Sequence, residues 1–249
     1  GGGDFAVSRG HAYFAEHSGR LYKQSLSNGS ARPITPAFGS AAAPTPSPDG
    51  RHLVYVHSCE GRDALAIVDS EGRVWPQLLA TGADFYMQPA WHPRGNRLAW
   101  VEWDHPQMPW DGTRLVLGRL SRTRDGLPTL REKETLAGGL ATVVVQPHFS
   151  PDGRHLAYAS DQLGHSNIWL RDLENGETRC LSQDAYDVAG PSWIQGLRAF
   201  SFSADGRILY FVRSEKSQRR AHSLDLQTGS ITALQALTEY SHIEQLTAA

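Results

Sequence analysis

Short stretches of alternating apolar and polar residues run along the whole chain, and tight turns separate them. In residues 154–160, for example, Leu156 and Tyr158 alternate with more polar or smaller neighbours. A period of two indicates a half-buried β-strand. Residues 151–153 before it read Pro-Asp-Gly, in which proline presets φ and glycine accepts the positive φ that a tight turn needs.

The clearest repeat unit spans residues 146–182. Its alternation predicts four strands, and the pair Asn175-Gly176 is typical of the centre of a hairpin turn. The predicted strands are 146–150, 154–160, 167–173 and 178–181. Four antiparallel strands of this kind make one blade of a β-propeller.

The turn before the second strand recurs along the chain. Its full form, Ser-Pro-Asp-Gly-Arg-His-Leu, occupies residues 47–53 and 150–156, and variants occupy 92–98 and 203–209. The glycines at 50, 95, 153 and 206 are separated by steps of 45, 58 and 53 residues. A repeat of this length is the sequence signature of a β-propeller, so we predict an all-β fold of four-stranded antiparallel blades.

The same pattern predicts five blades and the start of another. The five cover residues 5–35, 45–80, 88–136, 146–182 and 192–234, and residues 239–249 resemble the first strand of a further blade. The chain opens with Gly-Gly-Gly-Asp-Phe and stops after that strand-like segment. Because a ring of blades normally closes by pairing its first and last segments, we expect a domain of a longer protein with an incomplete ring.

Composition narrows the classes of function. Hydrophobic residues make up 40% and charged residues 20% of 249 residues, and the net charge is −2, so nucleic-acid and membrane-surface binding are not expected. No apolar run approaches the roughly 20 residues of a membrane-spanning helix. Cys59, placed in a connection, and Cys180, on an outer strand, are predicted to be reduced thiols, which favours a cytoplasmic location. Metal-ligand spacings are missing, so neither a metal nor a cofactor is expected.

A distinctive insertion interrupts the third blade between its second and third strands. It combines aromatic, proline and acidic residues, which make a stiff loop with side chains that are enriched at interfaces. We predict either a docking surface for another domain or a substrate, or a cap that packs on its own blade. The candidate docking residues are Trp103, Asp104, His105, Pro106, Met108, Pro109, Trp110 and Asp111.

At this loop the chain resembles bacterial members of the prolyl oligopeptidase family, in the acylaminoacyl-peptidase-like and dipeptidyl-aminopeptidase-like branch. The resemblance rests on residues 103–113 and extends to residues 1–7, 80–89 and 190–200, so it covers nearly the whole chain. It implies the propeller of a serine peptidase, whose C-terminal α/β-hydrolase domain is the partner within the same polypeptide and whose substrates are short peptides. Homo-oligomer formation is left open.

The chain lacks the catalytic half that the resemblance implies. No Gly-x-Ser-x-Gly nucleophile elbow is present, and the nearest match, residues 164–168, lacks the second glycine. We therefore expect no catalytic residue here and a role in restricting access to the hydrolase domain. The alternative is a stand-alone propeller that gathers partner proteins, as in the TolB-like class. A propeller enzyme acting on glycans or small molecules ranks last, because no repeated acids lie on the inner strands.

Overall fold

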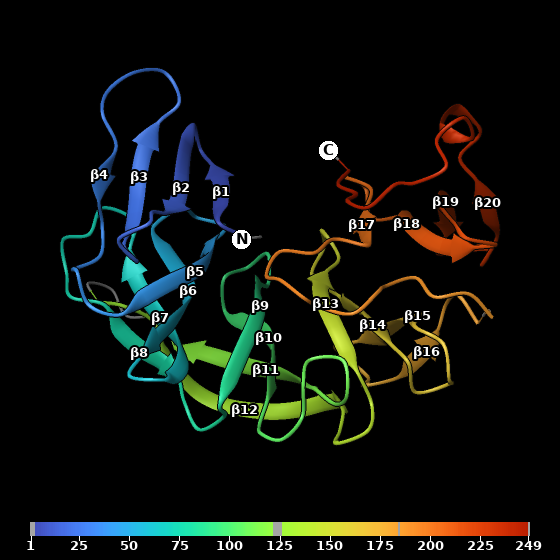
Figure 1. The fold of residues 1–249 in the computed structure, drawn as a ribbon, viewed down its shortest axis with the longest axis horizontal. Helices are drawn as coiled ribbons and strands as arrows, with labels where there is room; N and C mark the ends of the chain where they lie inside the picture. The colour runs from blue at the N-terminus through green and yellow to red at the C-terminus, as the bar shows by residue number, and fades with distance from the viewer. Residues whose placement is uncertain (1–2, 122–125, 184, 249) are drawn as a thin grey trace.

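The chain folds into five four-stranded antiparallel sheets that follow one another around a ring (Figure 1). The computed structural model describes residues 3–121, 126–183 and 185–248. Within each sheet the strands pair in chain order, as in the predicted blades. The strands are β1 (Phe5–Ser8), β2 (His11–Ala15), β3 (Leu21–Ser25), β4 (Arg32–Pro33), β5 (Ser40–Pro46), β6 (His52–Cys59), β7 (Arg62–Asp69), β8 (Gln77–Ala80), β9 (Phe85–Trp91), β10 (Arg97–Trp103), β11 (Arg114–Ser121), β12 (Thr129–Gly138), β13 (Val144–Phe149), β14 (His155–Ser160), β15 (Asn167–Asp172), β16 (Thr178–Cys180), β17 (Phe200–Phe202), β18 (Ile208–Glu215), β19 (Gln218–Asp225) and β20 (Ile231–Ala233).

The recurring turn is held together by its own side chains. In the fourth blade, the Ser150 hydroxyl donates to Asp152 Oδ1 at 2.6 Å, and the same oxygen accepts the Arg154 N–H at 2.9 Å. The His155 N–H donates back to Ser150 Oγ at 2.9 Å. Gly153 has φ +76°, a value that favours glycine. The sequence motif therefore supplies a turn that ends one strand and starts the next.

The inner strands of three blades share a bulge. Ala43, Gln88 and Gln146 each precede a proline and have φ between 51° and 53°. The register of β5–β6, β9–β10 and β13–β14 shifts at these positions. A bulge changes the direction of the side chain at its extra residue. Two of these three residues are glutamines, Gln88 and Gln146.

Apolar side chains fill the spaces between successive blades. Val54, Val56 and Ile67 of the second blade pack with Trp100 and Val116 of the third. Similar clusters join the first to the second blade, the third to the fourth, and the fourth to the fifth. Alternate residues of a strand face opposite sides, so each central strand serves two of these cores.

The first and fifth sheets stand on opposite sides of an opening in the ring (Figure 1). The segment after β20 contains a short 3-10 helix, Gln235–Leu237, and an isolated parallel bridge between Arg219 and His242. Ile243 and Leu246 then pack against the core of the fifth blade. This tail is therefore attached to the fifth blade.

The alternating strand directions give the ring two different ends. One end carries the Pro-Asp-Gly turns, and we call it the turn face. The other carries the connections from each blade to the next, together with residues 104–113 between β10 and β11. We call this end the crossover face, and the predicted docking loop lies there.

Candidate functional site

Residues 104–113 form the connection on which the docking hypothesis rests. Trp103 is the last residue of β10 and is 7% exposed, so it belongs to the blade and not to the connection. Its ring stacks on Phe85 at 5.1 Å between centroids, and His105 packs edge-on against the same Phe85 at 4.9 Å. Trp103 and His105 therefore pack on Phe85 of their own blade.

Asp104 ties the start of the connection to neighbouring backbone and to a cation. Arg114 Nη2 donates to Asp104 Oδ2 at 2.7 Å, and the Asp84 N–H donates to Asp104 Oδ1 at 3.0 Å. The His105 N–H in turn donates to Asp84 Oδ2 at 2.9 Å. The Arg114 and Asp84 hydrogen bonds outweigh desolvation and lower the pKa of Asp104. This carboxylate therefore holds the start of the connection in place.

The tip of the connection is a compact turn with an exposed apolar side. The Met108 N–H donates to Asp111 Oδ2 at 3.0 Å, and the Asp111 N–H donates to the Met108 carbonyl at 2.9 Å. Pro109 is buried, whereas Met108 is 44% exposed. Pro106 follows His105 through a cis peptide bond and is exposed.

Trp110 contacts the segment that leads into the fifth blade. Its ring lies 4.3 Å from that of Trp193, which belongs to the crossover before β17. Trp193 is 69% exposed and its neighbour Ile194 is 41% exposed. Leu140, which follows β12, is 72% exposed, and its carbonyl lies against Gly112 so closely that a Cβ there would sit 2.4 Å away. The structure thus gathers exposed apolar side chains from three connections on the crossover face.

Residues 190–197 also reach the inner strand of the third blade. Gln195 Nε2 donates to the Tyr86 carbonyl at 3.0 Å, and the Gln88 N–H donates to Gln195 Oε1 at 3.2 Å. Gln88 Nε2 donates to the Leu197 carbonyl at 3.4 Å. Cavities of about 350 and 360 Å³ lie in the ring interior, and Gln88 and Leu197 line both.

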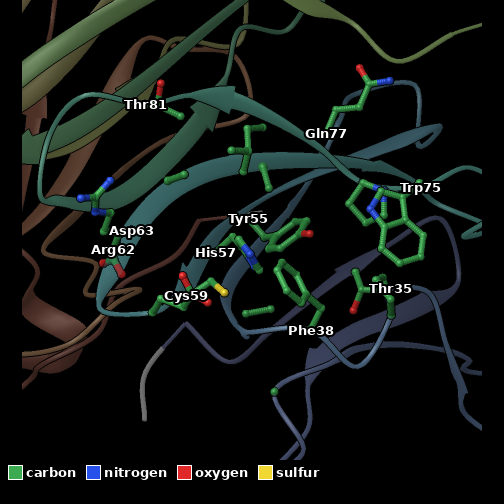
Figure 2. A pocket seen from close by; sticks show the side chains of 18 of the residues that line it. Thr35, Phe38, Tyr55, His57, Cys59, Arg62, Asp63, Trp75, Gln77 and Thr81 are labelled. Atoms are coloured by element: carbon green, nitrogen blue, oxygen red, sulfur yellow. The ribbon is translucent and has the colours of Figure 1, made fainter.

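A larger cavity lies at the outer wall between the first and second blades (Figure 2). Its volume is about 630 Å³. Strands β6 and β7 each have eight residues, whereas β2 and β3 have five and β4 only two. At about 3.3 Å per residue, the shorter first blade leaves the far part of its neighbour's face uncovered.

Aromatic side chains dominate one end of this cavity. Phe38, His57, Tyr55 and Trp75 gather there in Figure 2, whereas Arg62 lies at the other end. No sequence pattern marks these residues as a site. Tyr55 and His57 fit the ordinary alternation of a strand, and Phe38 and Trp75 lie in separate connections, so only the folded structure brings them together.

The described residues hold no cluster of three or more histidine, cysteine or acidic side chains arranged to bind a metal ion. In the same part of the chain, no helix is long and apolar enough to cross a membrane. Cys59 is the last residue of β6 and lines the cavity, so its predicted place in a connection was wrong. Cys180 lies on the outer strand β16, as predicted.

No protein-family model matches this chain. It is 27% identical over 159 residues to a TolB homologue of Chlorobium luteolum, a match that covers 64% of this chain and 33% of that protein. It is 33% identical over 98 residues to an uncharacterized peptidase, YuxL, of Bacillus subtilis, covering 35% and 15%.

A solved Mycobacterium tuberculosis peptidase that hydrolyses puromycin superimposes with a TM-score of 0.84 and 28% identity. The match covers 98% of this chain and 39% of that one. The chain thus spans about two fifths of the solved peptidase, and the fold, the near-complete coverage and the identity agree. The chain is therefore similar, over nearly its whole length, to the β-propeller portion of a peptidase of the prolyl oligopeptidase family.

Proposed function

We propose that this propeller covers a separate hydrolase domain of the same polypeptide and restricts access to it to short peptides. The similar solved peptidase has a chain that extends well beyond the aligned part, which leaves room for such a domain. Within this proposal the chain positions and selects peptides, and the catalytic groups lie elsewhere in the polypeptide.

The observation that carries the proposal is the apolar surface on the crossover face. Met108, Leu140, Trp193 and Ile194 are each at least 41% exposed and come from three connections. Large exposed apolar groups that lie together on a folded domain mark interaction sites, and tryptophan is enriched at the energetic centres of interfaces. Of the candidate docking residues, Met108 and Trp110 belong to this apolar surface. Trp103 and Asp104 hold the loop on its own blade.

The docking face can be tested by assembling the two halves of the parent protein. The chain and the remaining polypeptide are produced separately, and their affinity is measured by calorimetry. Trp193→Ala is expected to weaken assembly at least tenfold, as for an interface hot spot. The matched control is Trp75→Ala, because Trp75 is equally exposed, at 72% against 69%, but lies in the connection before β8 on the turn face. Equal loss in both variants would contradict the proposed docking face.

The covering role makes a prediction about activity and mass. An antibody against this chain should detect a species far heavier than 27.4 kDa in the source cells. The chain alone should hydrolyse no acyl-aminoacyl or dipeptidyl chromogenic substrate, whereas the heavier species should do so and be blocked by a serine-directed reagent. Hydrolysis of either substrate by the isolated chain would refute the proposal that the catalytic groups lie in the rest of the polypeptide.

A second candidate function is a stand-alone propeller that gathers partner proteins. The match to the TolB homologue, over 159 residues, favours it. A native species near 27.4 kDa would make this candidate the leading one, and the apolar crossover face would then be the surface that receives a partner protein.

A further inference from the structure

We propose that the cavity between the first and second blades binds a planar, uncharged aromatic group that carries a hydrogen-bond acceptor. This inference concerns this cavity and not the exposed apolar surface around Trp110 and Trp193. It holds whether or not the parent protein is a peptidase.

The cavity has the size and the walls of a small-molecule site. Its volume of about 630 Å³ falls within the usual range for such sites, which are mostly apolar with a few polar groups. The Phe38 and His57 rings stack at 5.8 Å, and Tyr55 meets His57 edge-on at 6.1 Å. Trp75 and Leu78 add exposed apolar surface at 72% and 61%. Flat ring faces favour a flat ligand, because aromatic pairs prefer stacked or edge-on contacts.

Tyr55 supplies the polar anchor. Its side chain is 3% exposed, yet its hydroxyl forms no hydrogen bond within the described part of the chain. The hydroxyl oxygen is nevertheless accessible at the surface of the protein. Buried tyrosine hydroxyls usually have a partner. An acceptor on a ligand inside the cavity would satisfy this donor.

The aromatic end of the cavity is uncharged at neutral pH. Burial lowers the pKa of His57 and raises that of Tyr55 well above its usual range. A neutral imidazole offers one donor and one acceptor, and His57 makes no hydrogen bond to another described side chain or backbone group. The Asp63 charge acts on the pKa of His57 in the opposite sense to burial but does not outweigh it, and Arg62 lies at the other end of the cavity (Figure 2). An anionic ligand would therefore lose its hydration at the aromatic end without gaining a cationic partner.

Gly39 lets the Phe38 wall approach so closely. Its φ is +64°, and a Cβ there would lie 2.5 Å from the Ser58 carbonyl oxygen and 2.6 Å from His57 Cε1. Only glycine permits this contact between the first crossover and β6. The aromatic end is therefore shaped by a backbone contact that any other residue would disrupt.

Benzamide is a suitable probe, because it is flat, neutral and carries a carbonyl acceptor. Saturation-transfer NMR on the chain should show transfer from the protein to benzamide. Three control compounds each lack one property: cyclohexanecarboxamide is not flat, benzoate is charged, and toluene has no acceptor. Each should bind more weakly than benzamide.

Two variants place the probe in the cavity. Tyr55→Phe removes only the hydroxyl and should weaken benzamide binding about three- to tenfold, the usual effect of one hydrogen bond, while leaving toluene unchanged. Trp75→Ala removes an exposed ring, so folding should be unaffected, and should weaken both compounds. Trp193→Ala, an equally exposed tryptophan on the crossover face, is the control and should change neither.

A second probe separates two sources of the same chemistry. Binding of N-acetylphenylalaninamide with the same dependence on Tyr55 would show that the cavity takes an aromatic side chain of a peptide. Binding of benzamide alone would show a site for a free aromatic compound. No transfer to benzamide, or transfer that neither Tyr55→Phe nor Trp75→Ala reduces, would overturn the proposal.

Discussion

At the scale of single residues, His92 takes over in its turn the role that a serine and an aspartate share in the full form of the motif. It stands where the other turns have serine, and its Nδ1 accepts the Arg94 N–H at 3.1 Å. Its Nε2 lies 2.9 Å from the Gly153 carbonyl oxygen of the next blade's turn, and burial lowers its pKa. Consecutive turns are thereby linked on the turn face, as they also are where Arg9 Nη2 donates to the Pro48 carbonyl at 2.9 Å.

The loss of unfolding free energy caused by Trp110→Ala distinguishes a docking loop from a loop that packs in the core. Trp110→Ala removes a ring that rests on an exposed ring, so we expect a loss of about 1 kcal/mol, as for one aromatic pair. A tryptophan buried in the core would cost about 3–5 kcal/mol. Urea unfolding, followed by circular dichroism, measures the difference. A loss in the larger range would mean that the loop is mainly a cap.

His148 should make stability depend on pH. Burial, with a smaller contribution from the Arg198 charge, lowers its pKa from 6.5 to about 4. The folded state therefore binds fewer protons than the unfolded state, and stability falls as pH drops from about 6.5 to about 4.

The full effect of this shift is about 3 kcal/mol. His148→Gln should therefore show a smaller loss of unfolding free energy between pH 7 and pH 4 than the parent chain. Urea titrations at several pH values would reveal it. The difference between the two proteins isolates this residue from the aspartates of the turns, which lose stabilising bonds in the same direction.

At the scale of elements, the blades are joined by side chains as well as by apolar cores. Gln146 Oε1 accepts the Ala199 N–H and its Nε2 donates to the Phe200 carbonyl, both at 2.6 Å. Gln88 Oε1 accepts the Gln146 N–H at 2.6 Å. The inner strands β9, β13 and β17 are thereby connected in sequence through the residues at their bulges.

Gln146→Ala should loosen the fifth blade selectively. The Ala199 N–H and the Phe200 carbonyl would lose their partners inside the protein, at a cost of about 2–4 kcal/mol. Hydrogen exchange should become faster in β17 and its neighbours and stay unchanged in β6 and β7. Ala43, at the equivalent place in the second blade, has no such side chain, so Ala43→Ser serves as the control substitution at a bulge. Uniform acceleration throughout the chain would contradict the local role.

The strands were predictable because their determinants are local. Alternation placed Leu156 and Tyr158 on β14, and the recurring turn, in its full form or as a variant, located the start of the second strand in four blades. The inter-blade bonds of Gln146 were not predictable, because they depend on a bulge and on a residue about 50 positions away. The pairing of Trp110 with Trp193 and the aromatic cavity at Tyr55 were hidden for the same reason.

At the scale of the whole molecule, the opening between the first and fifth sheets leaves one inner strand uncovered. Phe5 and Val7 of β1 are 63% and 57% exposed. Exposed apolar surface on a strand favours pairing with another chain.

We therefore expect the isolated chain to self-associate as its concentration rises. Phe5→Ser combined with Val7→Ser should reduce this association. The control is Leu26→Ser combined with Leu163→Ser, which removes residues of similar exposure, 59% and 52%, from connections elsewhere. Sedimentation velocity over a range of concentrations measures the effect. A chain that stays monomeric throughout would contradict the expectation.

The position of Cys59 gives the protein a built-in chemical handle. It lines the aromatic cavity, whereas burial raises the pKa of Cys180, the other cysteine, and so lowers the fraction of its reactive thiolate at neutral pH. A maleimide dye should therefore attach first to Cys59, which peptide mass mapping would verify. A fluorescent dye at the cavity wall would then report ligand binding through a change in its emission, without any substitution in the sequence.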